Sequence, residues 1–181
     1  MKIQLLTAEN YRTGAWSGGT TTELFIYPEN ADYAARQFLF RISSATVDLE
    51  ESDFTPLAGV ERYITPLAGH FTLEHPDGTK VEMGPLSAPY RFSGEIPTHC
   101  IGTVTDFNLM LKGVEGIMEL HRGAAPIRPG FNSFYAPQDG IFTLNGTAYP
   151  VKKGQMLIIF AEEEAGLQLQ GSLALGCFVR I

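Results

Sequence analysis

The segment Gly140-Ile141-Phe142-Thr143-Leu144-Asn145-Gly146 joins an alternating strand pattern to a dipeptide typical of tight hairpins. Asn-Gly favours a two-residue turn because both central positions of that turn require positive φ. A similar segment, Gly69-His70-Phe71-Thr72-Leu73, is followed by the turn dipeptide Asp77-Gly78, and the two copies end at the further glycines Gly84 and Gly154. Two copies about 70 residues apart predict one β-barrel unit that is used twice.

Apolar residues alternate with period two over most of the chain, for example in 38–47 and 101–112, and this is typical of strands. Glycine and proline, 19 and 11 of 181 residues, favour many short strands and tight turns. We predict an all-β fold of two tandem double-sheet β-barrels packed as one body, with at most one or two short helices, the clearest at 28–36. We expect a single domain over 1–181: a first half of about 38–122, and a second half of about 123–181 completed by N-terminal strands in 1–37.

The charge balance excludes several function classes. The chain carries 13 Lys and Arg against 20 Asp and Glu, a net charge of −7. Nucleic acids and anionic membrane surfaces both attract clusters of basic residues, so we expect neither as a partner. The apolar run Met156–Ala161 is too short to span a bilayer, and the first residues lack the apolar core of a signal peptide, so we expect a cytoplasmic protein. Cys100 and Cys177 indicate neither a disulfide framework nor a cysteine zinc site.

The pattern Glu61, Tyr63, Leu67, Gly69, then a turn and Gly84, resembles the core of the cupin family of double-sheet barrels. Metal-binding cupins carry a His-x-His pair shortly before the glutamate, whereas residues 53–58 contain no histidine, and neither does 122–181. We therefore predict no metal site and no cofactor. The four histidines, for which we expect solvated or structural roles, are His70, His75, His99 and His121.

Two strands place polar side chains among apolar ones. Arg41 and Ser43 share one face of 38–47, and Asp106 and Asn108 share one face of 104–112. Arg41 is either a solvated charge or an inward-facing cation that binds a ligand carboxylate or Glu23. Asp106 and Asn108 form either a donor and acceptor pair for a ligand or a bridge to loop backbone.

A third candidate is the loop and strand entry Trp16-Ser-Gly-Gly-Thr-Thr-Thr-Glu-Leu24. Its glycine pair permits a tight turn, and Trp16, Thr20 and Glu23 could line one wall of a pocket. The alternative is a plain entry into a strand, with Trp16 filling the core.

The chain resembles the HutD/Ves family in four segments, which follow one another in the family's order over about 100 residues. They are 16–24, 38–48, Phe54 with 56–62, and 105–110. The resemblance implies a metal-free bicupin fold. For the HutD branch it implies binding of a histidine-utilisation intermediate, urocanate or N-formylglutamate, and moderation of pathway output; for the Ves branch it implies a link to cold and general stress. Arg41 or Arg62 would then anchor a carboxylate, and Asp106 with Asn108 an amide or ring nitrogen.

Three hypotheses follow. The first is a regulatory protein that binds a small carboxylate metabolite. The second is a metal-independent enzyme, an isomerase or hydrolase that uses Glu23, Asp106 or His99 as acid and base. The third is a stress-related protein that acts through oligomerisation, with a homodimer formed through an exposed edge strand such as 155–160. We assign no catalytic residue and no metal ligand. The candidate ligand-binding residues are Trp16, Thr20, Glu23, Arg41, Ser43, Arg62, Asp106 and Asn108.

Overall fold

Nearly every regular element of the protein is a β-strand in the computed structural model, which describes residues 1–181. The chain divides into two units: unit 1 contains Met1–Tyr11 and Val114–Ile181, and unit 2 contains Arg12–Gly113. No helix is long and apolar enough to cross a membrane. The expected all-β fold is therefore confirmed.

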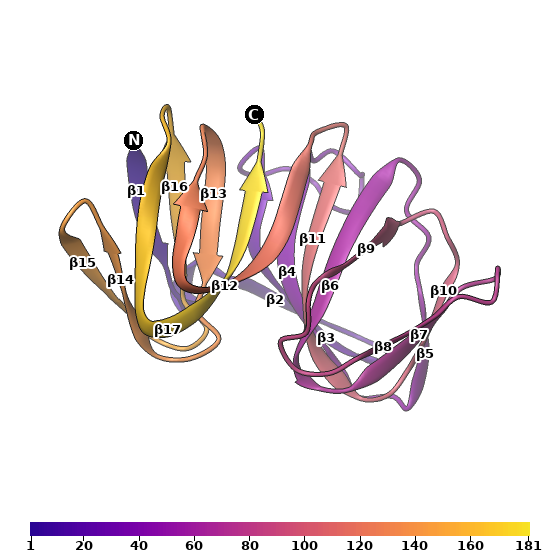
Figure 1. The fold of residues 1–181 in the computed structure, drawn as a ribbon. Coiled ribbons are helices and arrows are strands. Elements are labelled where there is room, and N and C mark those ends of the chain that lie inside the picture. Colours follow the sequence, from indigo (N-terminus) through magenta and orange to yellow (C-terminus); the bar gives the residue numbers. More distant parts are fainter. The chain divides into compact units, whose positions relative to one another are not determined.

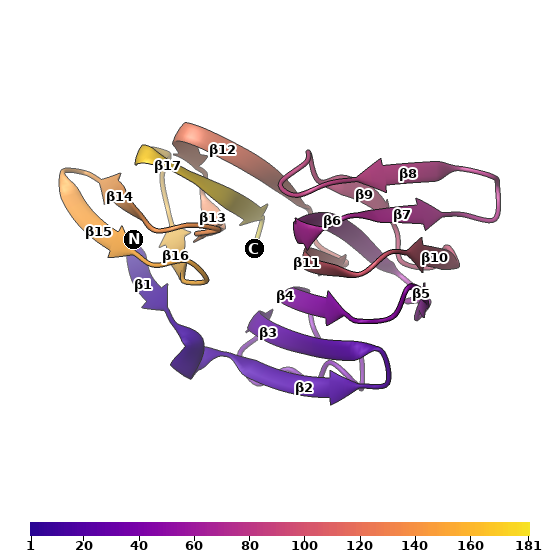
Figure 2. The ribbon, with the colours of Figure 1, turned by 90° about the horizontal axis from the view of Figure 1, so that it is seen from below.

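Unit 2 consists of two antiparallel sheets (Figures 1 and 2). The six strands of the first sheet, in spatial order, are β2 (Arg12–Trp16), β3 (Gly19–Tyr27), β4 (Phe40–Val47), β11 (Val104–Lys112), β6 (Val60–Gly69) and β9 (Tyr90–Ser93). The four strands of the second are β5 (Glu51–Phe54), β10 (Thr98–Ile101), β7 (Phe71–Glu74) and β8 (Lys80–Met83).

A shared apolar core joins the two sheets of unit 2. Ile64 and Val104 from the six-stranded sheet pack in one buried cluster with Leu73 and Cys100 from the four-stranded sheet. Alternation along each strand explains this arrangement, because every second side chain of a strand points to the same face. Each sheet therefore buries one face against the other, as the period-two pattern predicted.

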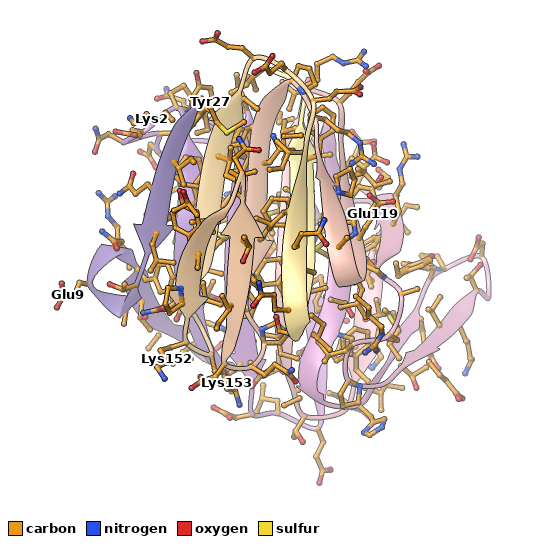
Figure 3. All side chains as sticks on the ribbon, turned by 60° about the vertical axis from the view of Figure 1, so that its left-hand side comes forward. Lys2, Glu9, Tyr27, Glu119, Lys152 and Lys153 are labelled. Carbon is orange, nitrogen blue, oxygen red and sulfur yellow. The ribbon has the colours of Figure 1, made fainter.

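Unit 1 contains one seven-stranded antiparallel sheet (Figure 1). Its strands are β1 (Lys2–Leu6), β12 (Gly116–Ile127), β13 (Gly130–Tyr135), β14 (Gly140–Leu144), β15 (Thr147–Val151), β16 (Met156–Ala161) and β17 (Ala165–Val179). Phe134, Phe142 and Leu157 are fully or almost fully buried in its apolar core. Charged residues such as Lys152 and Lys153 are exposed and project outward (Figure 3).

The two copies of the sequence repeat each form a hairpin. In unit 1, β14 pairs with β15 across Asn145 and Gly146, whose φ angles are 48° and 79°. In unit 2, β7 pairs with β8 across a turn in which Gly78 has a φ of 87°. The turn dipeptides therefore lie where the sequence predicted, one in each unit.

Three expectations about particular segments were wrong. Residues 28–36 form turns and no helix, because Asn30 and Arg36 adopt positive φ, which an α-helix cannot continue through. Of the N-terminal segment 1–37, only β1 joins the second half, where it pairs with β16. In unit 2, β2 pairs with β3, and β3 pairs with β4. Strand β16 is not an edge, since it is hydrogen-bonded to β1 on one side and to β13 on the other, so it is not free to pair subunits.

Candidate functional site

Unit 2 contains a cavity, open to solvent, with a volume of about 830 Å³ over the inner face of its six-stranded sheet. A volume of this size lies in the range of small-molecule sites. The polar and aromatic side chains around it come from β2 to β6, β11 and the loop before β4. They are Arg12, Thr13, Trp16, Ser17, Thr21, Glu23, Tyr33, Arg41, Ser43, Ser52, Asp53, Phe54, Thr55, Arg62, Asp106 and Asn108.

The strand register explains why polar residues far apart in the sequence converge there. Met110 of β11 pairs with Arg41 of β4 on one side and with Arg62 of β6 on the other. The two arginines therefore flank Met110 on one row of the sheet, with backbones about 10 Å apart, twice the usual spacing between strands. Asn108 occupies the next row of the same face and pairs with Ser43.

Arg41 is an inward-facing cation with a carboxylate partner. Its Nε donates to Glu23 Oε2 at 2.8 Å, and its Nη1 donates to Ser43 Oγ at 3.4 Å. The guanidinium carbon lies 4.1 Å from the centre of the Tyr33 ring. A β-bulge between Glu23 and Phe25 keeps Glu23 opposite Ser43 while the rest of β3 shifts its register. Of the two readings left open for Arg41, the structure shows the one in which it binds Glu23.

Arg62 is buried and less fully paired. Its Nη2 donates to Asn108 Oδ1 at 3.1 Å, whereas its Nε has no hydrogen-bond partner. The guanidinium lies 4.7 Å from the centre of the Phe54 ring and 5.2 Å from that of Phe92. Burial lowers the pKa of Arg62, and the charge of Asp106 opposes that shift. A buried donor without an acceptor is costly, so this nitrogen is a candidate ligand contact.

Asp106 ends the same chain of hydrogen bonds. Its Oδ1 accepts a short hydrogen bond from Asn108 Nδ2 and another from the Ala45 backbone N–H at 3.2 Å. Burial raises the pKa of Asp106 to about 7, although Arg62 and the two hydrogen bonds favour the ionised form. The pair Asp106 and Asn108 therefore bridges to backbone, as one reading expected, and also faces the cavity.

Trp16 and Thr20 do not both lie at the cavity as predicted. Trp16 does not fill the core: it is 41% exposed and lies at the cavity wall, with its ring where a Cβ on Gly18 would stand. Thr20 does not line the cavity, whereas its neighbour Thr21 does. Thr21 is two positions before Glu23 on β3, so the two side chains share a face, whereas Thr20 points to the other face. Strand alternation alone therefore predicts which of the two threonines lines the cavity.

Several lining residues, notably Arg12, Tyr33 and Phe54, are not among the residues that sequence patterns predict for the site. Phe54 was visible only as part of the family resemblance, and Tyr33 lies in a segment that was expected to be helical. No local pattern marks an aromatic ring that stacks on an arginine from another strand. Their roles depend on tertiary placement.

The residues present do not match the metal set of a cupin. No histidine lines the cavity, and no group of three or more His, Cys, Asp or Glu side chains is arranged to hold a metal ion. His75 is buried and lies within hydrogen-bonding distance of Tyr90 and Thr98, which is a structural role. His99 is within 2.8 Å of the exposed Asp53 carboxylate, so this histidine does not face Asp106 across the cavity.

The two-sheet unit, the hairpin repeat and the polar cavity define an all-β protein of cupin-like fold. The chain belongs to the HutD family, since the family model matches residues 8–175. No curated protein sequence matches it. Two similar solved structures are a conserved protein of unknown function from Pseudomonas aeruginosa PAO1 and HutD from Pseudomonas fluorescens SBW25. Their TM-scores are 0.84 and 0.81, both at 20% identity, over 100% and 99% of this chain and 100% of each of theirs.

A more distant likeness is to the bacterial pirin YhhW from Escherichia coli in complex with nickel(II). The TM-score is 0.67 at 12% identity, over 98% of each chain. At these identities the solved structures establish the fold alone.

Proposed function

We propose that this protein binds a small carboxylate metabolite in the cavity of unit 2, with Arg62 as the anchor. The observation that carries the proposal is the buried side chain of Arg62, which lines a cavity of about 830 Å³ and whose Nε lacks a hydrogen-bond partner. A guanidinium presents donors in a fixed fork that matches a carboxylate. Arg41 has less free capacity, because Glu23 already accepts from its Nε.

The aromatic rings beside Arg62 support the same role. Phe54 and Phe92 limit the motion of its guanidinium, so little side-chain entropy is lost when a ligand binds. Family membership favours urocanate or N-formylglutamate as the ligand, both of which carry a carboxylate. The proposed role is regulatory: ligand occupancy stabilises the bound state by an amount set by the ligand concentration relative to Kd. The two free, buried cysteines fit a reducing compartment such as the cytoplasm.

Isothermal titration of the protein with urocanate and with N-formylglutamate tests the proposal. We expect binding heat with at least one ligand and an affinity at least about tenfold weaker in Arg62→Met, since hydrogen bonds to charged groups contribute about 1.5–3 kcal/mol. Arg91→Met is the matched control, because Arg91 lies on β9 outside the cavity and pairs with Glu61. Absence of heat with both ligands rules out these two metabolites.

A second candidate function is acid–base catalysis by Asp106. A carboxyl group with a pKa of about 7 can donate and accept protons near neutral pH. The cavity offers it no histidine partner, and this favours binding over chemistry. Incubation of the protein with each metabolite, followed by NMR, distinguishes the two functions: a new product would establish catalysis.

A further inference from the structure

Two buried groups of opposite charge, Arg62 and Asp106, are joined by a single amide. Asn108 accepts from Arg62 Nη2 through its oxygen and donates to Asp106 Oδ1 through its nitrogen. All three side chains are at least nine-tenths buried, with 7%, 3% and 2% exposure for Arg62, Asn108 and Asp106. Arg62 lies on β6, and Asn108 and Asp106 lie two positions apart on β11. The strand register holds the three side chains on one face, with Asn108 between the other two.

The Arg62 guanidinium is held in a fixed orientation, but not all of its donors have an acceptor. Its Nε has no acceptor, and the Phe54 ring lies against it. Arg41, on the other side of Met110, differs because Glu23 pairs with it directly. Of the two buried arginines that line the cavity, Arg62 is therefore the one with an unused donor.

A ligand carboxylate at Arg62 changes the electrostatics of Asp106. In the free protein the charge of Arg62 stabilises the ionised form of Asp106. A second carboxylate at the same cation offsets that stabilisation and adds repulsion next to two buried side chains. When two carboxylates share one cation in such a site, one of them takes up a proton.

We propose that Arg62, Asn108 and Asp106 form a proton-coupled carboxylate site, in which binding of a ligand carboxylate at Arg62 is accompanied by protonation of Asp106. This inference rests on the proposed carboxylate-binding function. The proton comes from solvent: the ligand carboxylate remains ionised, Asp106 changes from carboxylate to carboxylic acid, and no other bond forms or breaks. The neutral Asp106 hydroxyl then becomes a donor at the cavity wall.

The other titratable groups near Asp106 do not account for the same coupling. Arg41 of β4 and Glu23 of β3 are paired with each other. Asp53 of β5 is exposed and lies within 2.8 Å of His99, and Arg12 of β2 is exposed. Tyr33 stacks on Arg41, and Cys100 of β10 is a buried thiol whose pKa is raised to about 11 by burial and by the charge of Asp106. Cys100 thus remains protonated near pH 7, whereas the pKa of Asp106 is about 7 in the free protein.

The experiment is a calorimetric titration with N-formylglutamate, whose carboxyl groups, with ordinary pKa values of about 3–4, remain ionised between pH 6 and 8. The titration is carried out at about pH 7.5, where a carboxyl group of ordinary pKa is ionised, in HEPES and in Tris, which differ in ionisation enthalpy. We expect the measured enthalpy to differ between the buffers by an amount that corresponds to uptake of up to about one proton, and the affinity to fall by up to about tenfold per pH unit above neutral.

Asp106→Asn is the decisive variant, since it keeps a hydrogen-bonding side chain and removes the proton site. We expect it to bind N-formylglutamate with no buffer dependence and no fall in affinity with pH. Asp77→Asn is the matched control, because Asp77 lies in the exposed turn between β7 and β8 and its removal should leave the coupling intact.

The outcomes separate the two proposals. Absence of binding heat with both metabolites rules out both as ligands and overturns the coupling proposed for them. Binding by the wild-type protein without buffer dependence overturns the proton coupling alone, and so does coupling that persists in Asp106→Asn. If Asp106→Asn does not fold, the wild-type buffer and pH series still decides the question.

Discussion

Arg41 and Glu23 form an ion pair that is largely shielded from water: the Nε to Oε2 distance is 2.8 Å, and the side chains are 8% and 16% exposed. Removal of one partner from a buried pair leaves an uncompensated charge, which is more costly than the pair is favourable. The pair therefore matters for the stability of the cavity wall as well as for its charge.

Substitution Glu23→Gln should lower the free energy of unfolding by about 2 kcal/mol, somewhat below the cost typical of fully buried pairs because Glu23 is partly exposed. Urea denaturation at pH 7 measures the change. Glu74→Gln is the control, since it breaks an exposed pair with Lys80 and should cost less than about 1 kcal/mol. Equal effects of the two substitutions would contradict the shielded character of the Arg41 pair.

The elevated pKa of Asp106 predicts a pH-dependent stability. In the folded protein Asp106 holds its proton up to about pH 7, whereas in the unfolded chain it loses it near pH 4. Between these values the unfolded chain binds fewer protons, so the stability that Asp106 contributes is complete at low pH and is lost as pH rises through 7. Relative to the wild type, Asp106→Asn should therefore become progressively more stable from pH 4 to pH 7, by at most about 1.4 kcal/mol per pH unit.

Urea denaturation of both proteins across this pH range gives the difference directly. For Asp77→Asn the stability difference should change with pH in the opposite direction. Hydrogen bonds from Thr79 lower the pKa of the exposed Asp77, so the stability that Asp77 contributes is lost as pH falls. A constant difference between Asp106→Asn and the wild type would show that Asp106 does not titrate in this range.

Gly19 should not tolerate a side chain. Its φ is 151°, and a Cβ there would lie 1.9 Å from the carbonyl oxygen of Thr46 on β4. Gly19→Ala must shift the β3–β4 ladder and should cost about 2 kcal/mol or more in unfolding free energy. Gly14→Ala on β2 is the matched control, since nothing lies within 4 Å of its added Cβ, and should change stability by less than about 0.5 kcal/mol.

Trp16 should report on ligand binding, because it is the only tryptophan of the chain and lies at the cavity wall. Saturation with N-formylglutamate should change the intrinsic fluorescence, and Trp16→Phe should lose this tryptophan signal while calorimetry still detects binding. If calorimetry shows saturation and the wild-type fluorescence stays constant, the ligand does not alter the surroundings of Trp16.

Much of the cavity wall follows from local sequence patterns. Alternation places Arg41 with Ser43 and Asp106 with Asn108, because side chains two positions apart on a strand share a face. The same rule distinguishes Thr21 from Thr20. It does not reveal that β2 pairs with β3, and β3 with β4, in unit 2, or that β1 pairs with β16 in unit 1, since the partner of a strand depends on the whole sheet.

By itself the sequence determined that this protein is all-β, that the dipeptides at 77–78 and 145–146 lie in the turns of two hairpins, and which side chains of one strand point to the same face. Only the tertiary structure decided that Arg41 is neutralised by Glu23, that Arg62 keeps a buried donor free, and that Asn108 links it to Asp106. The physical reason is the range of the interactions: strand alternation and turn geometry depend on neighbours in the chain, whereas pairing between charges depends on strand register and on the exclusion of water by residues far away in sequence.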